Sequence, residues 1–365
     1  DGMDAEVAKI LPETELYGKT GIQKQIFNTV YQLMAVKQQT PELLQQAKTL
    51  LMLPDYFGFR LTGNKLSEYT NGSTTQLVNP DTFQWDKELI RKLGYPEDIF
   101  LPLQMPGTKV GQLLPEIQKE VGFDLEVVLC GSHDTASAVM AVPQTEGDGI
   151  YISSGTWSLM GIESLKPVIT EDAAAANFTN EGGYDHRFRF LKNIMGLWMI
   201  QSVRHEYNDA YSFAQLCNMA EESKEFPSRV DVNDQSFLSP DSMVEAIRQY
   251  CHKTGQPVPE SVGELTSVVY RSLAQSYGET VRGLEKIAGK TYDSIHIIGG
   301  GSNAAYLNQL TADATGKTVY AGPGEATAIG NLLAQMIHAG DLADLKSARK
   351  CVRESFEIKT FAPAK

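Results

Sequence analysis

Cysteine is scarce in this 365-residue sequence, and its four cysteines form no C-x-x-C pair. They are Cys130, Cys217, Cys251 and Cys351. Their wide spacing argues against both a zinc ribbon and a disulfide framework, so we expect reduced thiols in a cytoplasmic protein. No apolar run reaches about 18 residues, so we expect no membrane-spanning helix. Residues 1–5 lack the basic and apolar regions of a signal peptide, and we expect none there.

Positive charge is scarce as well. The sequence has 32 Lys and Arg residues against 45 Asp and Glu residues, which gives a net charge of −13. An acidic surface repels nucleic acid and anionic membranes over long range, so we expect neither as a partner. A phosphate-bearing ligand would have to be held by backbone N–H groups and a metal ion rather than by a basic patch.

The organisation of the chain is clearest in its last third, where strands at 294–298 and 318–321 alternate with helices at 303–315 and 325–338. This alternation predicts an α/β fold, and the length suits two domains. Further upstream, residues 1–58 have a helical apolar pattern that includes Ile26, Val30, Leu33 and Met34, then Leu43 and Leu44. Because a polar, glycine-bearing connector at 144–149 precedes a new strand pattern, we predict domains at 1–142 and 143–365.

Three turns contain glycines that a phosphate could approach. Ser154-Gly155-Thr156 joins two predicted strands and can point N–H groups and a hydroxyl at phosphate oxygens, although Ser and Gly favour plain hairpin turns too. Gly299-Gly300-Gly301 follows a buried strand and precedes a helix, which suits a ligand at the helix N-terminus or a tight structural turn. Gly322-Pro323-Gly324 precedes the next helix, where Glu325 would complement the helix dipole.

The segment 299–304 also fits the dinucleotide-binding pattern G-x-G-x-x-A. That interpretation requires an acidic residue at the end of the following strand. The strand ends at Tyr320-Ala321-Gly322, without a carboxylate, so the sequence does not favour a dinucleotide site.

A candidate general base follows the strand predicted at 126–130. The stretch Ser132-His133-Asp134-Thr135 would bring Asp134 to the carboxyl edge of a sheet, where ligands bind in open α/β folds. There Asp134 could take a proton from a substrate hydroxyl during phosphoryl transfer. The alternative is an aspartate that caps the following helix, the commonest role for Asp at such a position.

Taken together, these segments resemble the FGGY family of carbohydrate kinases, and within it the branch that acts on L-rhamnulose. The matching stretches run through most of the chain in order: 52–57, 60–63, 68–71, 131–139, 153–161, 180–183, 191–198, 299–301 and 322–324. The Ser-His-Asp-Thr stretch at 132–135 and the Lys-Asn-Ile-Met-Gly-Leu-Trp stretch at 192–198 favour that branch.

The resemblance implies an α/β fold with two ribonuclease-H-like domains of the actin-like ATPase type around a cleft. It implies transfer of the γ-phosphoryl group of ATP, with Mg²⁺, to the 1-hydroxyl of L-rhamnulose. It would make Asp134 the general base, and this assignment overrides the helix-cap alternative. The sugar would be bound by His133, Asp134, Thr135 and Asn193, and ATP by Gly155, Thr156, Gln201, Gly300 and Gly301. It assigns no metal ligand.

One departure from the family concerns the beginning of the chain. Family members begin with a β-hairpin that orders the metal and the phosphates, and residues 1–58 contain no such hairpin. We therefore expect an incomplete first domain and a chain that alone is inactive. Two alternatives follow: a non-catalytic remnant that binds sugar or nucleotide, and a kinase of the same family for another deoxyketose such as L-fuculose.

Overall fold

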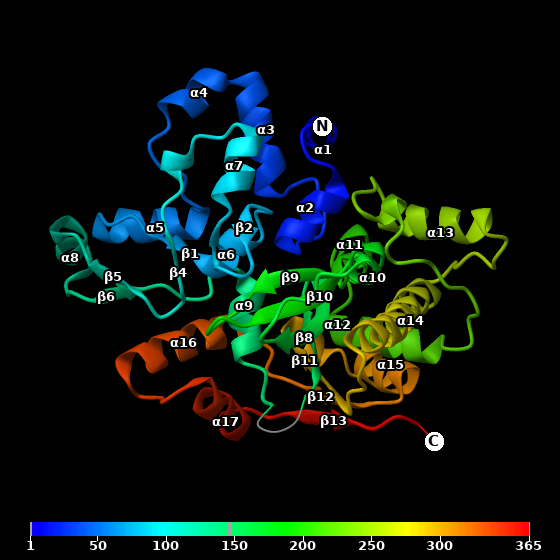
Figure 1. Ribbon diagram of the computed structural model, residues 1–365. Coiled ribbons are helices and arrows are strands. Elements are labelled where there is room, and N and C mark those ends of the chain that lie inside the picture. Colours follow the sequence, from blue (N-terminus) through cyan, green and yellow to red (C-terminus); the bar gives the residue numbers. More distant parts are fainter. Residues whose placement is uncertain (1, 145–147, 365) are drawn as a thin grey trace. The chain divides into compact units, whose positions relative to one another are not determined.

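The computed structural model describes residues 2–144 and 148–364 and shows a mixed α/β fold (Figure 1). Its contacts divide the chain into two compact units. Unit 1 contains Asp1–Met140, Glu163–Leu191 and Thr327–Ala348, and unit 2 contains Ala141–Ile162, Lys192–Ala326 and Arg349–Lys365. The domain boundary after residue 142 stays a prediction, and the connector predicted at 144–149 lies partly outside the described residues.

The N-terminal part of unit 1 is helical, as the apolar pattern predicts. The helices are α1 (Met3–Ala8), α2 (Glu13–Thr20), α3 (Thr29–Gln39), α4 (Pro41–Gln46), α5 (Leu53–Thr62), α6 (Tyr69–Ser73) and α7 (Lys87–Leu93). Pro41 begins α4, and Gly94 ends α7 in the left-handed conformation. Val30, Leu33 and Met34 enter the core, whereas Ile26 is 70% exposed and Leu43 is 60% exposed.

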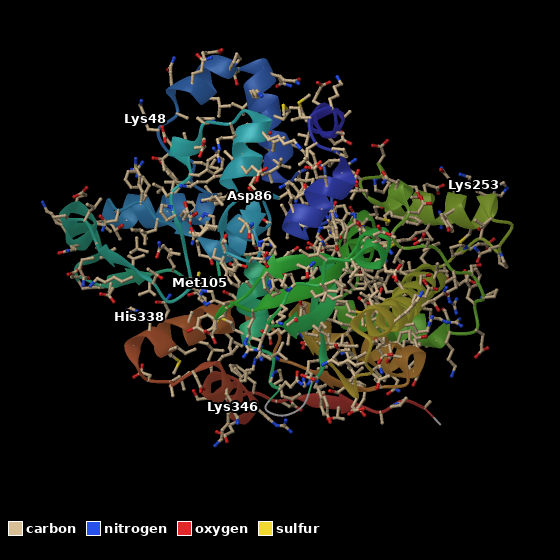
Figure 2. The ribbon with its side chains drawn as sticks, in the orientation of Figure 1. Lys48, Asp86, Met105, Lys253, His338 and Lys346 are labelled. Carbon is tan, nitrogen blue, oxygen red and sulfur yellow. The ribbon has the colours of Figure 1, made fainter. Side chains whose placement is uncertain are left out.

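Short strands and three further helices complete the part of unit 1 that carries the candidate base. β1 (Ser67–Glu68) pairs in parallel with β4 (Leu103–Gln104), β2 (Val78–Asn79) pairs with β3 (Gln84–Trp85), and β5 (Lys109–Gln112) pairs with β6 (Glu126–Val128). The helices are α8 (Pro115–Val121), α9 (Asp134–Met140) and α16 (Ala326–Ala339). Gly330 of α16 allows close contact with the Ser137 carbonyl of α9. His338, labelled in Figure 2, lies at the end of α16. Its Nδ1 donates to the Gly107 carbonyl at 2.8 Å.

A seven-stranded sheet has the order β13-β12-β11-β7-β8-β10-β9. Its strands are β7 (Ile150–Ser154), β8 (Trp157–Ser164), β9 (Thr179–Gly182), β10 (Phe188–Met195), β11 (Ser294–Ile298), β12 (Thr318–Ala321) and β13 (Lys359–Phe361). β7, β11 and β12 are parallel, so their carboxyl ends lie at one edge of the sheet. The strands predicted at 294–298 and 318–321 are confirmed.

Among the helices of unit 2, α14 packs against both α12 and α15 (Figure 1). They are α11 (Trp198–Glu206), α12 (Phe213–Glu222), α13 (Met243–Lys253), α14 (Val262–Ala288) and α15 (Ala305–Thr315); α10 (Glu171–Ala175) belongs to unit 1, and α17 (Leu345–Ser355) has residues in both units. β10 continues to Met195, and α11 begins three residues later at Trp198. No helix in the described part is long and apolar enough to cross a membrane. All four cysteines are free.

Candidate functional site

Asp134 is the first residue of α9 and follows the loop that leaves β6. Its Oδ1 accepts a hydrogen bond from the Thr135 N–H at 2.7 Å, and its side chain is exposed. A capping aspartate precedes its helix and accepts from the second or third N–H of that helix. Asp134 instead lies inside the helix and accepts from its immediate neighbour, so the geometry does not match a helix cap. An exposed carboxylate at this position is accessible to a substrate hydroxyl.

The imidazole of His133 is held by a buried arginine on β10. Arg189 Nη2 lies 3.1 Å from His133 Nδ1. Because a guanidinium can only donate, Nδ1 must accept, and the ring hydrogen is then on Nε2. Burial, followed by the positive charge of Arg189, lowers the pKa of His133. At neutral pH the ring is therefore uncharged and offers an N–H donor to a hydroxyl oxygen.

Arg189 is in turn neutralised by Glu181 of β9. The guanidinium Nη2 and the carboxylate Oε2 form an ion pair at 3.1 Å. Arg189 Nε also donates to the Gly182 carbonyl at 2.9 Å. Neither Arg189 nor Glu181 was predicted as a site residue. The sequence does contain a signal for Arg189, which lies between two phenylalanines in an apolar strand. This pattern indicates a buried arginine, and a fully buried arginine requires a partner.

Thr135, the third predicted sugar contact of unit 1, is buried in α9. Its hydroxyl lies 3.4 Å from Asp134 Oδ1. On the other side of the same turn, the Thr327 hydroxyl of α16 donates to the Asp134 carbonyl at 3.3 Å. The structure therefore brings His133, Asp134 and Thr135 together at the start of one helix and fixes the backbone there.

In unit 2, the three glycine-bearing turns lie at one edge of the sheet. They follow β7, β11 and β12, whose carboxyl ends share that edge. Two of the turns are linked directly, because the Gly299 N–H donates to the Pro323 carbonyl at 3.0 Å. The carboxyl edge of parallel strands is where open α/β folds bind ligands.

The individual glycines of the 299–301 turn have different roles. Gly299 has a φ of 83°, and a Cβ on it would lie 2.9 Å from the Ser154 carbonyl oxygen. A Cβ on Gly301 would overlap the Ser154 hydroxyl. Close packing against β7 therefore requires both. Gly300 is exposed, and a Cβ on it would meet nothing within 4 Å, so this residue leaves open space at the turn.

The turn between β7 and β8 is tied to the start of α11. Gly155 and Thr156 are exposed, and their carbonyls accept from Leu197 N–H at 3.1 Å and Trp198 N–H at 3.0 Å. The half-buried Gln201 lies one turn further along α11. Thus the structure brings the predicted ATP-binding residues 155, 156 and 201 onto connected elements, while Asn193 is half-buried on β10 in unit 2.

The described residues contain no group of three or more His, Cys, Asp or Glu side chains that could hold a metal ion. ATP-dependent enzymes bind Mg²⁺ through one or two carboxylates together with substrate phosphates and water. A cage of protein ligands is therefore not required for Mg²⁺ to be used, and we assign no protein ligand to it.

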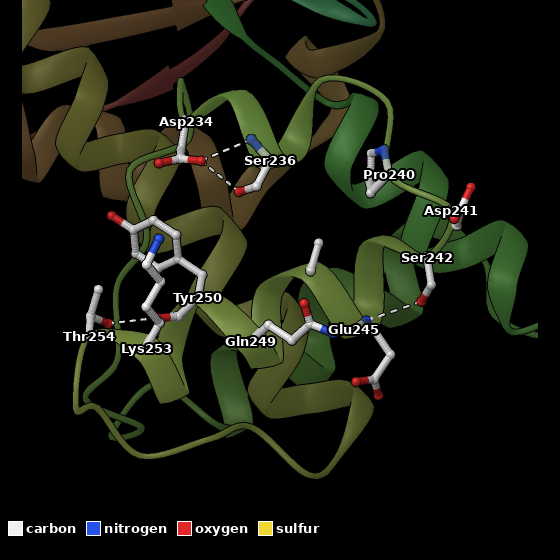
Figure 3. A pocket seen from close by; sticks show the side chains of 11 residues that line it. Asp234, Ser236, Pro240, Asp241, Ser242, Glu245, Gln249, Tyr250, Lys253 and Thr254 are labelled. Atoms are coloured by element: carbon white, nitrogen blue, oxygen red, sulfur yellow. Dashed lines mark hydrogen bonds between the residues drawn. The ribbon is translucent and has the colours of Figure 1, made fainter.

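A hollow of about 590 Å³ in unit 2 contains none of the predicted site residues (Figure 3). Its polar groups serve local structure. Asp234 Oδ1 accepts from the Ser236 N–H and hydroxyl at 2.9 and 2.6 Å, and Ser242 Oγ caps α13 by accepting from the Glu245 N–H. We assign no ligand to this hollow.

Comparison with known proteins agrees with this arrangement. Residues 4–141 match the N-terminal domain, and residues 150–339 the C-terminal domain, of the FGGY family of carbohydrate kinases. The chain is 51% identical to a rhamnulokinase of Halalkalibacterium halodurans over 100% of this chain and 78% of that protein. It is 46% identical to a rhamnulokinase of Bacillus subtilis over 97% of this chain and 72% of that protein.

Solved structures show the same fold at low sequence identity. A ligand-bound xylulose kinase from Lactobacillus acidophilus has a TM-score of 0.76 at 17% identity, covering 99% of this chain and 73% of that chain. A Plasmodium falciparum glycerol kinase with ADP has a TM-score of 0.75 at 15% identity, covering 100% and 73%. These likenesses confirm the predicted α/β fold of the actin-like type. Since family patterns match most of its length, the chain belongs to the FGGY family of carbohydrate kinases.

Proposed function

We propose that this protein is an ATP-dependent kinase that phosphorylates the 1-hydroxyl of L-rhamnulose. The observation that supports it most is the exposed carboxylate of Asp134 beside an imidazole that Arg189 keeps neutral. The substrate follows from the relatives of 46% and 51% identity, both of which are rhamnulokinases. Their match to essentially the whole chain does not favour a non-catalytic remnant.

In the proposed reaction, Asp134 orients the sugar hydroxyl and takes up its proton. The hydroxyl oxygen forms a bond to the γ-phosphorus, the bond from that phosphorus to the bridging oxygen breaks, and ADP leaves. His133 donates from Nε2 to a sugar oxygen, and Thr135 and Asn193 complete the sugar contacts. The transition state of phosphoryl transfer is loose, so the position of the hydroxyl should matter more than the strength of the base.

The ATP phosphates are proposed to bind at the sheet edge formed by the three glycine turns. There Thr156 offers its hydroxyl, Gly300 and Gly301 offer backbone groups, Gly155 leaves room for the phosphates beside Thr156, and Gln201 borders the nucleotide. Mg²⁺ would enter with ATP and neutralise phosphate charge, which suits a protein with a net charge of −13. Use of ATP and four free thiols both fit a cytoplasmic location.

The substrate can be tested with the purified full-length protein in a coupled assay of ADP release. We expect sugar-dependent turnover with L-rhamnulose and much less with L-fuculose, the substrate of the alternative proposal. Higher kcat/KM for L-fuculose would refute the assignment of the sugar but not of the reaction. Absence of sugar-dependent ADP release with either ketose, and with D-xylulose, would refute the kinase function itself.

A further inference from the structure

We propose that Glu68 and Thr70 are positioning residues that hold the loop 131–133, and thereby Asp134 and His133, in the geometry needed for phosphoryl transfer. The inference rests on the proposed kinase function, since it concerns how the base of that reaction is held. All residues concerned lie in unit 1. Both Glu68 and Thr70 have an exposed fraction of 0% and lie outside the set proposed to touch sugar or ATP.

Glu68 ends β1 and links two segments that are distant in sequence. Its carboxylate accepts from the N–H groups of Thr70 at 2.6 Å and Asn71 at 3.0 Å, which caps α6. The same carboxylate accepts from Ser132, 64 residues further along, through the N–H at 3.2 Å and the hydroxyl at 2.6 Å. One buried group therefore joins the start of α6 to the loop that precedes Asp134.

Thr70 adds a second link to the same loop. Its hydroxyl donates to Glu68 Oε2 at 2.6 Å and accepts from the His133 N–H at 3.2 Å. The residues directly before Asp134 are thus held twice, once through Ser132 and once through His133. Both links end on Glu68, so loss of its carboxylate would remove both, whereas loss of either link alone leaves the loop before Asp134 held only by the other.

The number of hydrogen-bond donors around Glu68 explains why a carboxylate occupies this position. Burial raises the pKa of Glu68, while the hydrogen bonds from Ser132, Thr70 and Asn71 oppose that shift. A helix cap needs only the contacts to α6, and an uncharged Ser or Asn would supply them without desolvating a charge. The contacts to Ser132, and through Thr70 to His133, are what the carboxylate provides in addition.

A matched pair of substitutions separates positioning from simple stability. Thr70 and Thr75 both have fully buried hydroxyls that donate once and accept once. The Thr75 hydroxyl donates to the Gly72 carbonyl at 2.6 Å and accepts from the Leu77 N–H at 3.2 Å, without any link to residues 131–134. Thr70→Val and Thr75→Val should therefore lower the Tm by similar amounts.

Turnover should distinguish the two variants. We expect Thr70→Val to lower kcat at least about tenfold, because a small misplacement of a reacting group costs one to two orders of magnitude. Its KM for ATP should stay near the wild-type value, and Thr75→Val should keep wild-type kcat. Adding Thr70→Val to Asp134→Asn should change kcat little further, because the positioning acts through Asp134.

The outcomes can be told apart. If the wild-type protein is an active kinase, either of two results would refute the positioning role. One is an equal kcat for Thr70→Val and Thr75→Val. The other is that Thr70→Val lowers kcat in the Asp134→Asn background by the same factor as in the wild type. A wild-type protein without sugar-dependent turnover would refute the proposed function and this inference together. If Thr70→Val does not fold, Ser132→Ala removes one link of the same loop and is expected to lower kcat in the same way.

Discussion

Asp55 should make the stability of unit 1 depend on pH in a direction opposite to that of most carboxylates. It lies in α5 with an exposed fraction of 3%, and its Oδ1 accepts from the Glu68 N–H at 3.1 Å. Its Oδ2 is buried without a hydrogen-bond partner among the described residues. Burial, followed by the negative charge of Glu68, raises the pKa of Asp55 to about 7.

The sign and size of the effect follow from proton linkage. In the unfolded chain Asp55 loses its proton near its ordinary pKa of 3.8, whereas in the folded protein it keeps the proton up to about pH 7. The folded state therefore binds more protons in this window, and the stabilisation is complete below pH 3.8 and lost as the pH rises to about 7. A difference of about 3 pKa units corresponds to about 4 kcal/mol of unfolding free energy.

Asp55→Asn should remove this dependence, because an amide keeps the Oδ1 acceptor and does not ionise. The free energy of unfolding can be measured by urea titration from about pH 4 to pH 8, using the fluorescence of Trp85 of unit 1 in a background with Trp157→Phe and Trp198→Phe. The exposed Asp81 provides the control variant Asp81→Asn. At pH 8 we expect Asp55→Asn, unlike Asp81→Asn, to have a higher free energy of unfolding than its parent. Between pH 4 and pH 7 the free energy of unfolding of Asp55→Asn should fall less than that of the parent. An unchanged pH slope in Asp55→Asn would refute the reasoning.

Two further predictions concern the proposed ligand contacts. Arg189→Lys keeps the charge but loses the planar guanidinium that donates to His133 and Gly182. Initial rates should therefore show a KM for the sugar about tenfold higher and an unchanged KM for ATP. A rise in the KM for ATP alone would contradict this prediction. Gly300→Ala has room for its methyl group and should fold normally but raise the KM for ATP, whereas Gly301→Ala meets the Ser154 hydroxyl and should lower the free energy of unfolding by about 1–3 kcal/mol. A Gly300→Ala variant that is destabilised but keeps the wild-type KM for ATP would contradict this prediction.

Elements with strong local signals were predictable from the sequence. The helix at 87–93 ends at Gly94 because glycine adopts the left-handed conformation there without strain, and Pro41 begins α4 because its missing N–H has no partner in a first helical turn. The strands at 294–298 and 318–321 are short apolar runs bounded by turn residues. In each case the determining residue lies within the element or directly beside it.

Elements defined by distant partners were not predictable in this way. The polar stretch at 173–187 contains β9, which becomes a strand by pairing with β10. Periodicity placed Ile26 and Leu43 on an apolar face, but it does not show whether a neighbouring element covers them, and both are exposed. Similarly, Asp134 and His133 were identified from their own stretch, whereas Glu68 and Arg189 reach it from 64 and 56 residues away.

The most direct test of the proposed mechanism is the turnover of Asp134→Asn, measured together with ATP affinity. Asn retains the size of the side chain and an acceptor for the Thr135 N–H, so the start of α9 should be preserved. It cannot take up a proton, and we expect kcat to fall by about 10²–10⁴-fold while calorimetry shows ATP binding close to that of the wild type. Turnover of Asp134→Asn within a few-fold of the wild-type protein would contradict the assignment of Asp134 as the general base.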